Sequence, residues 1–144
     1  MRGRRCRSFA VKALRGILAD YPADVAVIFR HWPLEYHRFA YPAARAAECA
    51  AKQGRFDAFH DLVYDKQDSL GLKSFSSFAI ESGVHDVNDF DKWNAMTSPV
   101  EAIDAGRTDA RALKFTGTPA VLAYSQAPDS AQLHQLVADI VRQK

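Results

Sequence analysis

Hydrophobic positions along this chain recur mostly at the spacing of helices. In residues 5–21 apolar side chains recur at steps of three and four, and Pro22 follows, which predicts an amphipathic helix. Similar patterns predict helices over residues 42–53, where Pro42 suits a helix start, and over 56–67, 74–83, 86–96, 99–115 and 131–143. Ser74 is a suitable N-cap, and Gly54 and Gly83 are suitable helix ends.

Two short runs break this helical pattern. VAVIF (25–29) is continuously apolar and rich in β-branched residues, which favours a strand buried on both faces. AVLAY (120–124) is similar and follows a GTP turn at 117–119. The order helix, strand, helices, strand, helix indicates an α/β protein. Two strands alone are too few for a stable sheet, so the pattern also indicates that a strand is missing.

Composition narrows the class of protein. A chain of 144 residues fits a single domain, and 48% apolar with 25% charged residues is ordinary for a soluble globular protein. The net charge of +2 argues against a nucleic-acid binder, and no apolar run approaches the ~20 residues of a membrane span. The basic start resembles a signal-peptide n-region, but Lys12 and Arg15 interrupt the apolar stretch that would follow. As written, the chain is expected to be cytoplasmic.

Few residues of the sequence suggest a catalytic or metal-binding role. The two cysteines, Cys6 and Cys49, make no disulfide framework. Cys49 lies in an alanine-rich helical pattern, which favours a packing role. The five histidines have no metal-ligand spacing, and we expect them on loops and at the surface, with His60 on a helix. No metal site or cofactor is predicted.

The segment FRHWPLEYHRFAYPAARAAECAAKQGRFDAFHDLVY (29–64) resembles bacterial DsbA-like thioredoxin-fold thiol–disulfide oxidoreductases. The similarity extends over residues 3–124 and includes the GTP turn. It implies one thioredoxin-like α/β domain over residues 1–144, with a helical insertion at about 41–113. The helix over 5–21 corresponds to the one that begins with the family's C-x-x-C motif.

This correspondence implies a degenerate active site. The four motif positions fall on Gly3, Arg4, Arg5 and Cys6. The nucleophilic cysteine is therefore replaced by Gly3, and Cys6 takes the position of the resolving cysteine. Because dithiol exchange needs both thiols, we expect impaired oxidoreductase activity. The expected partners are thiols and disulfides of proteins or peptides.

A second part of the site is implied at Thr118–Pro119, which resembles the family's cis-proline loop. There the backbone of Thr118 is expected to pair with an extended substrate peptide. The family's first core strand has no counterpart in the chain, and in the fold it lies between the strands matched by 25–29 and 120–124. Without it, the backbone groups on the inner edges of those two strands lack partners.

Several alternatives stay open. The chain is either a degenerate member of the family or one whose start codon is placed too late, in which case the protein is expected to be periplasmic or secreted. A late start does not account for Gly3. A non-catalytic interaction protein, completing its sheet with a strand from another chain or as a homodimer, is the main alternative. A relative of glutathione-linked isomerases or transferases is a weaker one.

Overall fold

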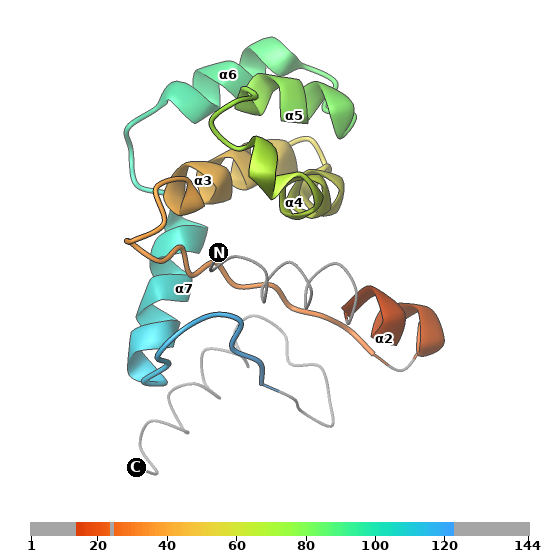
Figure 1. Cartoon of the computed structure of the whole chain (residues 1–144), viewed down its shortest axis with the longest axis vertical. Helices are drawn as coiled ribbons and strands as arrows, with labels where there is room; N and C mark the ends of the chain where they lie inside the picture. The colour runs from red at the N-terminus through yellow and green to blue at the C-terminus, as the bar shows by residue number, and fades with distance from the viewer. Residues whose placement is uncertain (1–13, 24, 123–144) are drawn as a thin grey trace. The chain divides into compact units, whose positions relative to one another are not determined.

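The described part of the protein is helical (Figure 1). The structure is a computed structural model that describes residues 14–23 and 25–122. Its elements are α2 (Arg15–Asp20), α3 (Ala40–Ala51), α4 (Phe56–Asp65), the 3₁₀ helix η2 (Gln67–Ser69), α5 (Phe75–Glu81), α6 (Val87–Ala95) and α7 (Glu101–Ala112).

Helices predicted from periodicity are confirmed wherever the structure describes them. Helices α3 to α7 correspond to the five predicted over residues 42–115, with ends that differ by up to three residues, the most at the end of α7. Helix α3 begins at Ala40, so that Pro42, the predicted start, lies within its first turn. Proline is tolerated there because its missing N–H would have no partner within the helix. Of the predicted helix 5–21 only α2 is described, and the helix over 131–143 lies outside the described residues.

The predicted strands are not confirmed. Residues 25–30 and 120–122 have no strand assignment, and residues 123 and 124 lie outside the described part. Among the described residues the only β-type pairing is an isolated bridge between Leu70 and Lys73. A strand requires a hydrogen-bonded neighbour, and a favourable apolar pattern does not supply one. The expected α/β class is therefore not visible in the described residues.

The ends of α5 show how local sequence sets helix boundaries. The Ser74 side chain accepts a hydrogen bond from the Ser77 N–H at 3.1 Å, as an N-cap does. At the other end, Gly83 has φ +80°, its N–H donates to the Ile80 carbonyl, and the N–H of Val84 donates to Ala79. This pair of bonds is a Schellman motif, which glycine favours because it has no Cβ. Both predicted ends of this helix are confirmed.

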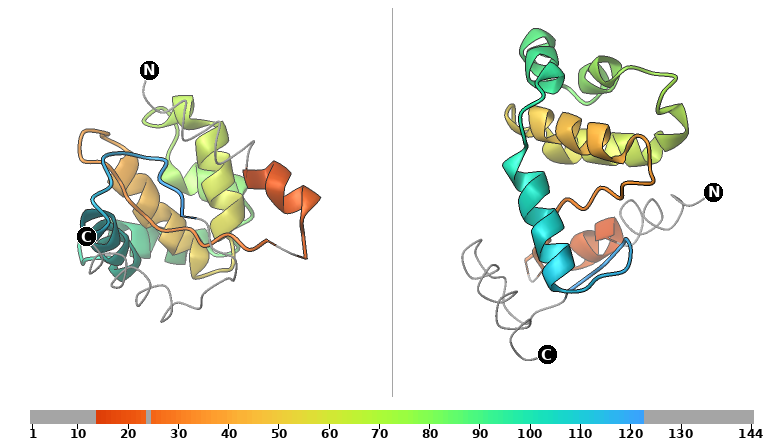
Figure 2. Two further views of the ribbon diagram at one scale, coloured as in Figure 1. Left: turned by 90° about the horizontal axis from the view of Figure 1, so that it is seen from below. Right: turned by 90° about the vertical axis from the view of Figure 1, so that its left-hand side faces the viewer.

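The chain forms two compact units, one comprising Pro33–Ile103 and the other Met1–Trp32 with Asp104–Lys144. In the first, which we call the helical unit, α3 contacts α4, α5 and α6. Figures 1 and 2 show α3 and α4 side by side, with α5 and α6 forming a second layer against them. We call the other unit the split unit, because it is made from the two ends of the chain.

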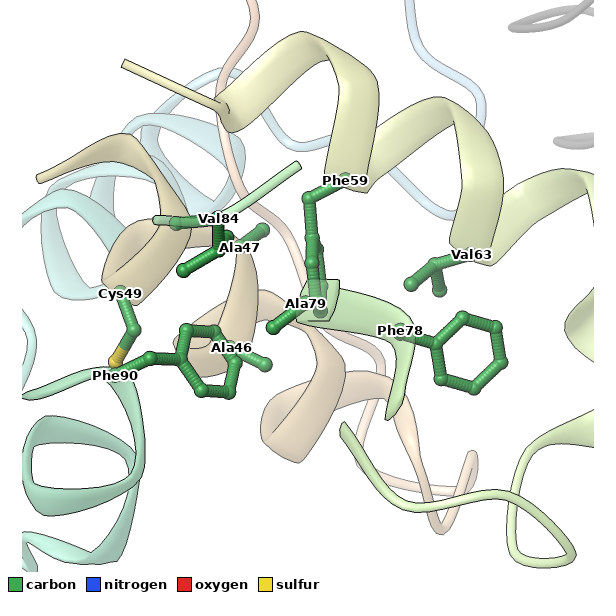
Figure 3. Packing of buried hydrophobic residues seen from close by; sticks show 10 residues of the cluster. Ala46, Ala47, Cys49, Phe59, Val63, Phe78, Ala79, Val84 and Phe90 are labelled. Carbon is green, nitrogen blue, oxygen red and sulfur yellow. The ribbon is translucent and has the colours of Figure 1, made fainter. Parts of the chain in front are cut away.

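The core of the helical unit lies between these two layers (Figure 3). Phe59, Phe78 and Phe90 are fully buried there, and the rings of Phe59 and Phe90 lie 5.8 Å apart between centroids. The facing side of α3 is made of small residues: Ala46, Ala47, Cys49 and Ala50. These small side chains leave room for the aromatic rings of the neighbouring helices.

Polar contacts close the same unit at one end. The side-chain Oε1 of Gln53 accepts hydrogen bonds from the backbone N–H groups of His85 and Asp86, at 3.1 and 2.9 Å. Its amide nitrogen donates to the Asp86 carbonyl at 2.8 Å. Asp86 also caps α6 by accepting from the Asp89 N–H. One side chain after α3 thus holds the start of α6.

Candidate functional site

The segment that follows the apolar run 25–29 packs against α7 within the split unit. His31 is buried, and a Cβ added at Gly106 would lie 2.0 Å from its carbonyl oxygen. Only glycine fits at that position of the helix, because any side chain would collide with the backbone of His31. The expectation of a surface histidine is therefore wrong for His31: α7 covers it.

An ion pair joins the same two elements. The Arg30 guanidinium donates to one carboxylate oxygen of Asp109 through Nη2 at 2.6 Å and through Nε at 3.1 Å. Both side chains are partly buried, which limits the screening of this pair by solvent. The ion pair of Arg30 with Asp109 and the close packing of Gly106 on His31 together fix the path of the chain beside α7.

The end of α7 directs the chain toward Thr118. Lys114 has a positive φ of 54°, its N–H donates to Arg111, and the N–H of Phe115 donates to Ala110. This is again a Schellman motif, here with lysine in the position that favours glycine. The Phe115 ring then lies 6.2 Å from that of Trp32, between centroids. The start of the loop is thus held on both sides.

The loop that follows contains the predicted substrate-contact residues. The peptide bond between Thr118 and Pro119 is cis. Thr118 is half-buried and Pro119 is exposed. Beyond them Val121 and Leu122 are exposed apolar residues, 58% and 41% accessible, and no backbone hydrogen bond is formed by either within the described part of the chain.

Of the two cysteines, only Cys49 lies within the described residues. Gly3 and Cys6, the predicted motif positions, lie outside the described residues. Cys49 lies in the core of the helical unit and is 4% exposed. Burial raises the pKa of its thiol, although the nearby cations Arg45 and Lys52 act in the opposite direction. Cys49 is therefore a packing residue, as its alanine-rich helix predicts.

A pocket of about 210 Å³ lies next to Cys49 in the helical unit. Its charged lining residues balance, with Arg45 and Lys52 against Glu48 and Glu101. Lys52 is placed over the ring of Trp93 at 4.8 Å. Among residues 14–23 and 25–122, no group of three or more His, Cys, Asp or Glu side chains could hold a metal ion. The described helices include none that is long and apolar enough to span a membrane.

Comparison with known proteins decides the family. A sequence model of the family described as Thioredoxin matches residues 4–139, nearly the whole chain. The chain belongs to the thioredoxin family. The match includes Cys6 and the Thr118–Pro119 loop.

The curated relatives of this thioredoxin-family chain are much longer proteins. "Na(+)/H(+) antiporter NhaA 1" of Mycolicibacterium vanbaalenii is 32% identical over 115 residues, which cover 78% of this chain and 18% of that protein. "Na(+)/H(+) antiporter NhaA 3" of Salinispora tropica is 47% identical over 62 residues, covering 42% of this chain and 9% of that protein. The chain thus spans less than a fifth of the relatives it matches. No solved structure matches it.

Sequence reasoning missed the residues that position the loop of this thioredoxin domain. Arg30 and Asp109 are 79 positions apart, and nothing in either local pattern pairs them. A glycine inside a helical pattern, as at Gly106, signals a close packing contact, but does not name the neighbour. Nothing in the sequence pattern predicts the contact between Trp32 and Phe115.

Proposed function

We propose that the chain is a DsbA-like thiol–disulfide oxidoreductase with a single active-site thiol at Cys6. The observation that carries the proposal is the thioredoxin-family match over residues 4–139, which contains both Cys6 and the Thr118–Pro119 loop. The resemblance of residues 29–64 to the DsbA-like group supports this narrower class.

The proposed reaction is thiol–disulfide exchange carried out by the single sulfur of Cys6. The Cys6 thiolate attacks a disulfide sulfur of the substrate, the substrate S–S bond breaks, and a mixed disulfide forms. The departing sulfur leaves as a thiolate and takes up a proton. Because Gly3 has no sulfur, release needs a second thiol from outside, such as glutathione, which attacks the mixed disulfide. Arg4, Arg5 and Arg7 surround Cys6 in sequence and favour its thiolate electrostatically.

Thr118 and Pro119 form the proposed substrate platform. An extended peptide would lie along the backbone of Thr118 and against the exposed apolar side chains of Val121 and Leu122. Such backbone pairing depends little on the sequence of the peptide, because the hydrogen-bonding groups are the same in every residue except proline. The expected substrates are therefore exposed disulfides in extended segments of other proteins.

Removal of each thiol in turn tests the assignment. Formation of a mixed disulfide with an oxidised model peptide, followed by mass spectrometry, should be lost in Cys6→Ser and retained in Cys49→Ala. Cys49 serves as the matched control because it is buried and its pKa is raised. Adduct formation that survives Cys6→Ser would refute the role of Cys6.

Restoring the missing sulfur gives a complementary test. Gly3→Cys recreates a C-x-x-C motif, and we expect turnover in insulin reduction to rise at least about tenfold, because release becomes intramolecular. Gly3→Ser, which adds a hydroxyl but no thiol, is the control and should not raise turnover. Turnover in the unmodified chain equal to that of Gly3→Cys would show that one thiol is sufficient.

A non-catalytic interaction role is the second candidate, and one observation favours it. Val27 and Ile28 are exposed apolar residues in an extended segment that has no strand partner within the described residues. An open edge of this kind pairs readily with a strand from another chain. Hydrogen exchange at high dilution tests it: fast exchange of the amides of 26–28 supports an open edge, and protected amides exclude it.

The antiporter activity in the names of the relatives is not proposed for this chain. Residues aligned with "Na(+)/H(+) antiporter NhaA 1" make up only 18% of that protein. The thioredoxin-family match covers residues 4–139 of this chain, and the proposed chemistry concerns that domain alone.

A further inference from the structure

The pocket beside Cys49 is built by the helical unit. Its lining residues come from α3, from α6 and from residues 96–101, all of which belong to Pro33–Ile103. Figures 1 and 2 show the segment that joins α6 to α7 passing one end of α3. The pocket has a volume of about 210 Å³, whereas sites for drug-sized ligands occupy about 300–1,000 Å³. It therefore suits a small molecule.

Arg45 places a buried positive charge in the wall of this pocket. The residue is 9% exposed, its Nη2 donates to the Ser98 carbonyl, and its guanidinium lies 5.7 Å from the centroid of the Tyr41 ring. Neither partner is negatively charged, and no carboxylate of the described residues lies within ion-pair distance of Arg45. Buried charges in proteins are normally paired, and a guanidinium has five N–H donors to offer. An anion in the pocket would supply the missing counter-charge.

The other charged residues of the lining are more accessible to water than Arg45. Glu48 is half-buried, and Lys52 and Glu101 are exposed. Lys52 also lies over the ring of Trp93, with its Nζ 4.8 Å from the ring centroid. Because solvent screens exposed charges more than buried ones, Arg45 dominates the electrostatics of the inner part of the pocket. The lining charges balance as a whole, but the buried one is positive.

Apolar side chains form the rest of the wall. Trp93 and Val100 are half-buried, and Met96 and Pro99 are exposed. Small-molecule sites typically combine such apolar and aromatic walls with a few polar groups that fix the orientation of the ligand. A guanidinium is well suited to this task, because its planar fork of N–H groups matches the two oxygens of a carboxylate.

We propose that this pocket binds a small organic carboxylate with an apolar or aromatic body. Arg45 donates to the carboxylate through the N–H groups that Ser98 does not use, and the hydrocarbon part packs against Trp93 and Val100. The lining includes neither Thr118 nor Pro119, so this binding goes beyond the proposed thiol–disulfide exchange and does not depend on it.

Titration of the full chain with benzoate, followed by NMR of side-chain N–H groups, tests the proposal. We expect saturable shifts at the indole N–H of Trp93 and at the Nε–H of Arg45. Trp32 lies outside the lining, so its indole N–H is the internal control and should not shift. Benzamide, which has a similar shape but no charge, should bind at least about tenfold more weakly. Equal affinity for benzoate and benzamide would overturn the proposal.

Removal of one charge of each sign from α3 tests which of them binds the ligand. Arg45→Met keeps an unbranched side chain without the cation and should weaken benzoate binding at least about tenfold. Arg45→Lys keeps the charge and should retain part of the affinity. Glu48→Gln is the matched control from the same helix and the same lining, and should leave the affinity unchanged or raise it. A loss in Glu48→Gln as large as that in Arg45→Met would overturn the proposal.

A variant that narrows the pocket separates ligand binding from the structural role of Arg45, whose bond to Ser98 holds the segment before α7. Val100→Phe enlarges a lining residue and leaves the charge of Arg45 in place. Benzoate should raise the melting temperature of the unmodified chain, because it binds the folded state, and should not raise that of Val100→Phe. An equal rise in both would place the binding elsewhere and overturn the proposal.

The class of ligand is tested with phenylglycine, which carries an ammonium group as well as a carboxylate. Because the buried charge of the pocket is positive, phenylglycine should bind no more tightly than benzoate. Binding at least about tenfold tighter would assign the ammonium to Glu48 or Glu101 and overturn the proposal of a simple carboxylate.

Discussion

The helical unit and the split unit differ in how their backbone hydrogen bonds are formed and their apolar side chains are buried. In the helical unit, the helical hydrogen bonds of α3 to α6 join residues close in sequence, and the largest side chains lie in a shared core. In the split unit, the run 25–29 has strand-forming side chains but no described strand beside it, and residues 26–29 are exposed. A helix supplies its own hydrogen-bond partners, whereas a strand depends on another segment.

This difference teaches where each unit is sensitive. The helical unit depends on filled volume at its core. The split unit depends on a few close contacts between its two chain ends, above all those of Gly106 and Arg30. Four substitutions or titrations, ordered by the size of their expected effect, test this contrast.

The largest effect is expected at the centre of the helical core. Phe59→Ala removes a fully buried ring and leaves a cavity beside Phe90, which should lower the free energy of unfolding by about 3–5 kcal/mol. Guanidinium titration followed by circular dichroism measures this change. Leu72→Ala, at a site 89% exposed, is the control and should change stability little. A loss below about 1 kcal/mol for Phe59→Ala would contradict the importance of this core.

The close contact in the split unit comes next. Gly106→Ala sets a methyl group against the His31 carbonyl, so we expect it to destabilise by about 1–3 kcal/mol. Gly16→Ala is the matched control, since α2 has open space at that position and alanine favours helix by about 1 kcal/mol. Chemical denaturation of the two variants should therefore give changes of opposite sign. Equal stabilisation by both would show that α7 does not pack on His31.

A smaller, stabilising effect is expected at the end of α7. Lys114→Gly relieves a left-handed backbone conformation that costs a non-glycine residue about 1–2 kcal/mol, partly offset by the greater freedom of glycine when unfolded. The melting temperature should rise, with a net gain of about 0.5–1 kcal/mol. Lys114→Ala keeps the Cβ and should give no such gain. A decrease for Lys114→Gly would mean that the lysine side chain contributes more than its conformation costs.

The smallest effect concerns pH in the helical unit. Hydrogen bonds from Lys66 and Lys73 lower the pKa of the Glu81 carboxyl. A lowered folded-state pKa gives stability that is present above the unfolded pKa and is lost as pH falls through the folded value. Glu81→Gln should thus lower the urea midpoint slightly at neutral pH and leave it unchanged in acid. Because these groups are exposed, salt should reduce the difference.

Prediction from sequence succeeded where the physical cause is local. Ser74 and Gly83 end α5 through contacts within a few residues, and the five helices from 40 to 112 follow the period of their own apolar side chains. Cys49 is buried because it shares the apolar face of α3. For the site, Thr118 and Pro119 were named through family resemblance, and Cys6 lies outside the described residues.

Prediction was incomplete where the cause lies between distant segments. The runs at 25–29 and 120–124 have the composition of strands, and neither forms one in the described residues, because pairing depends on a third segment. The buried position of His31 depends on Gly106, which lies 75 positions later in the chain. No local pattern encodes such a contact.

The sequence by itself determined the helices, their caps and membership of the thioredoxin family, since periodicity, capping and motif spacing are properties of neighbouring residues. Only the tertiary structure decided that α7 covers His31, that Arg30 pairs with Asp109, and that no strand among the described residues lies beside Ala26, Val27 and Ile28. The physical reason is that these outcomes depend on which distant segments meet, and steric fit and hydrogen bonding are settled only when they do.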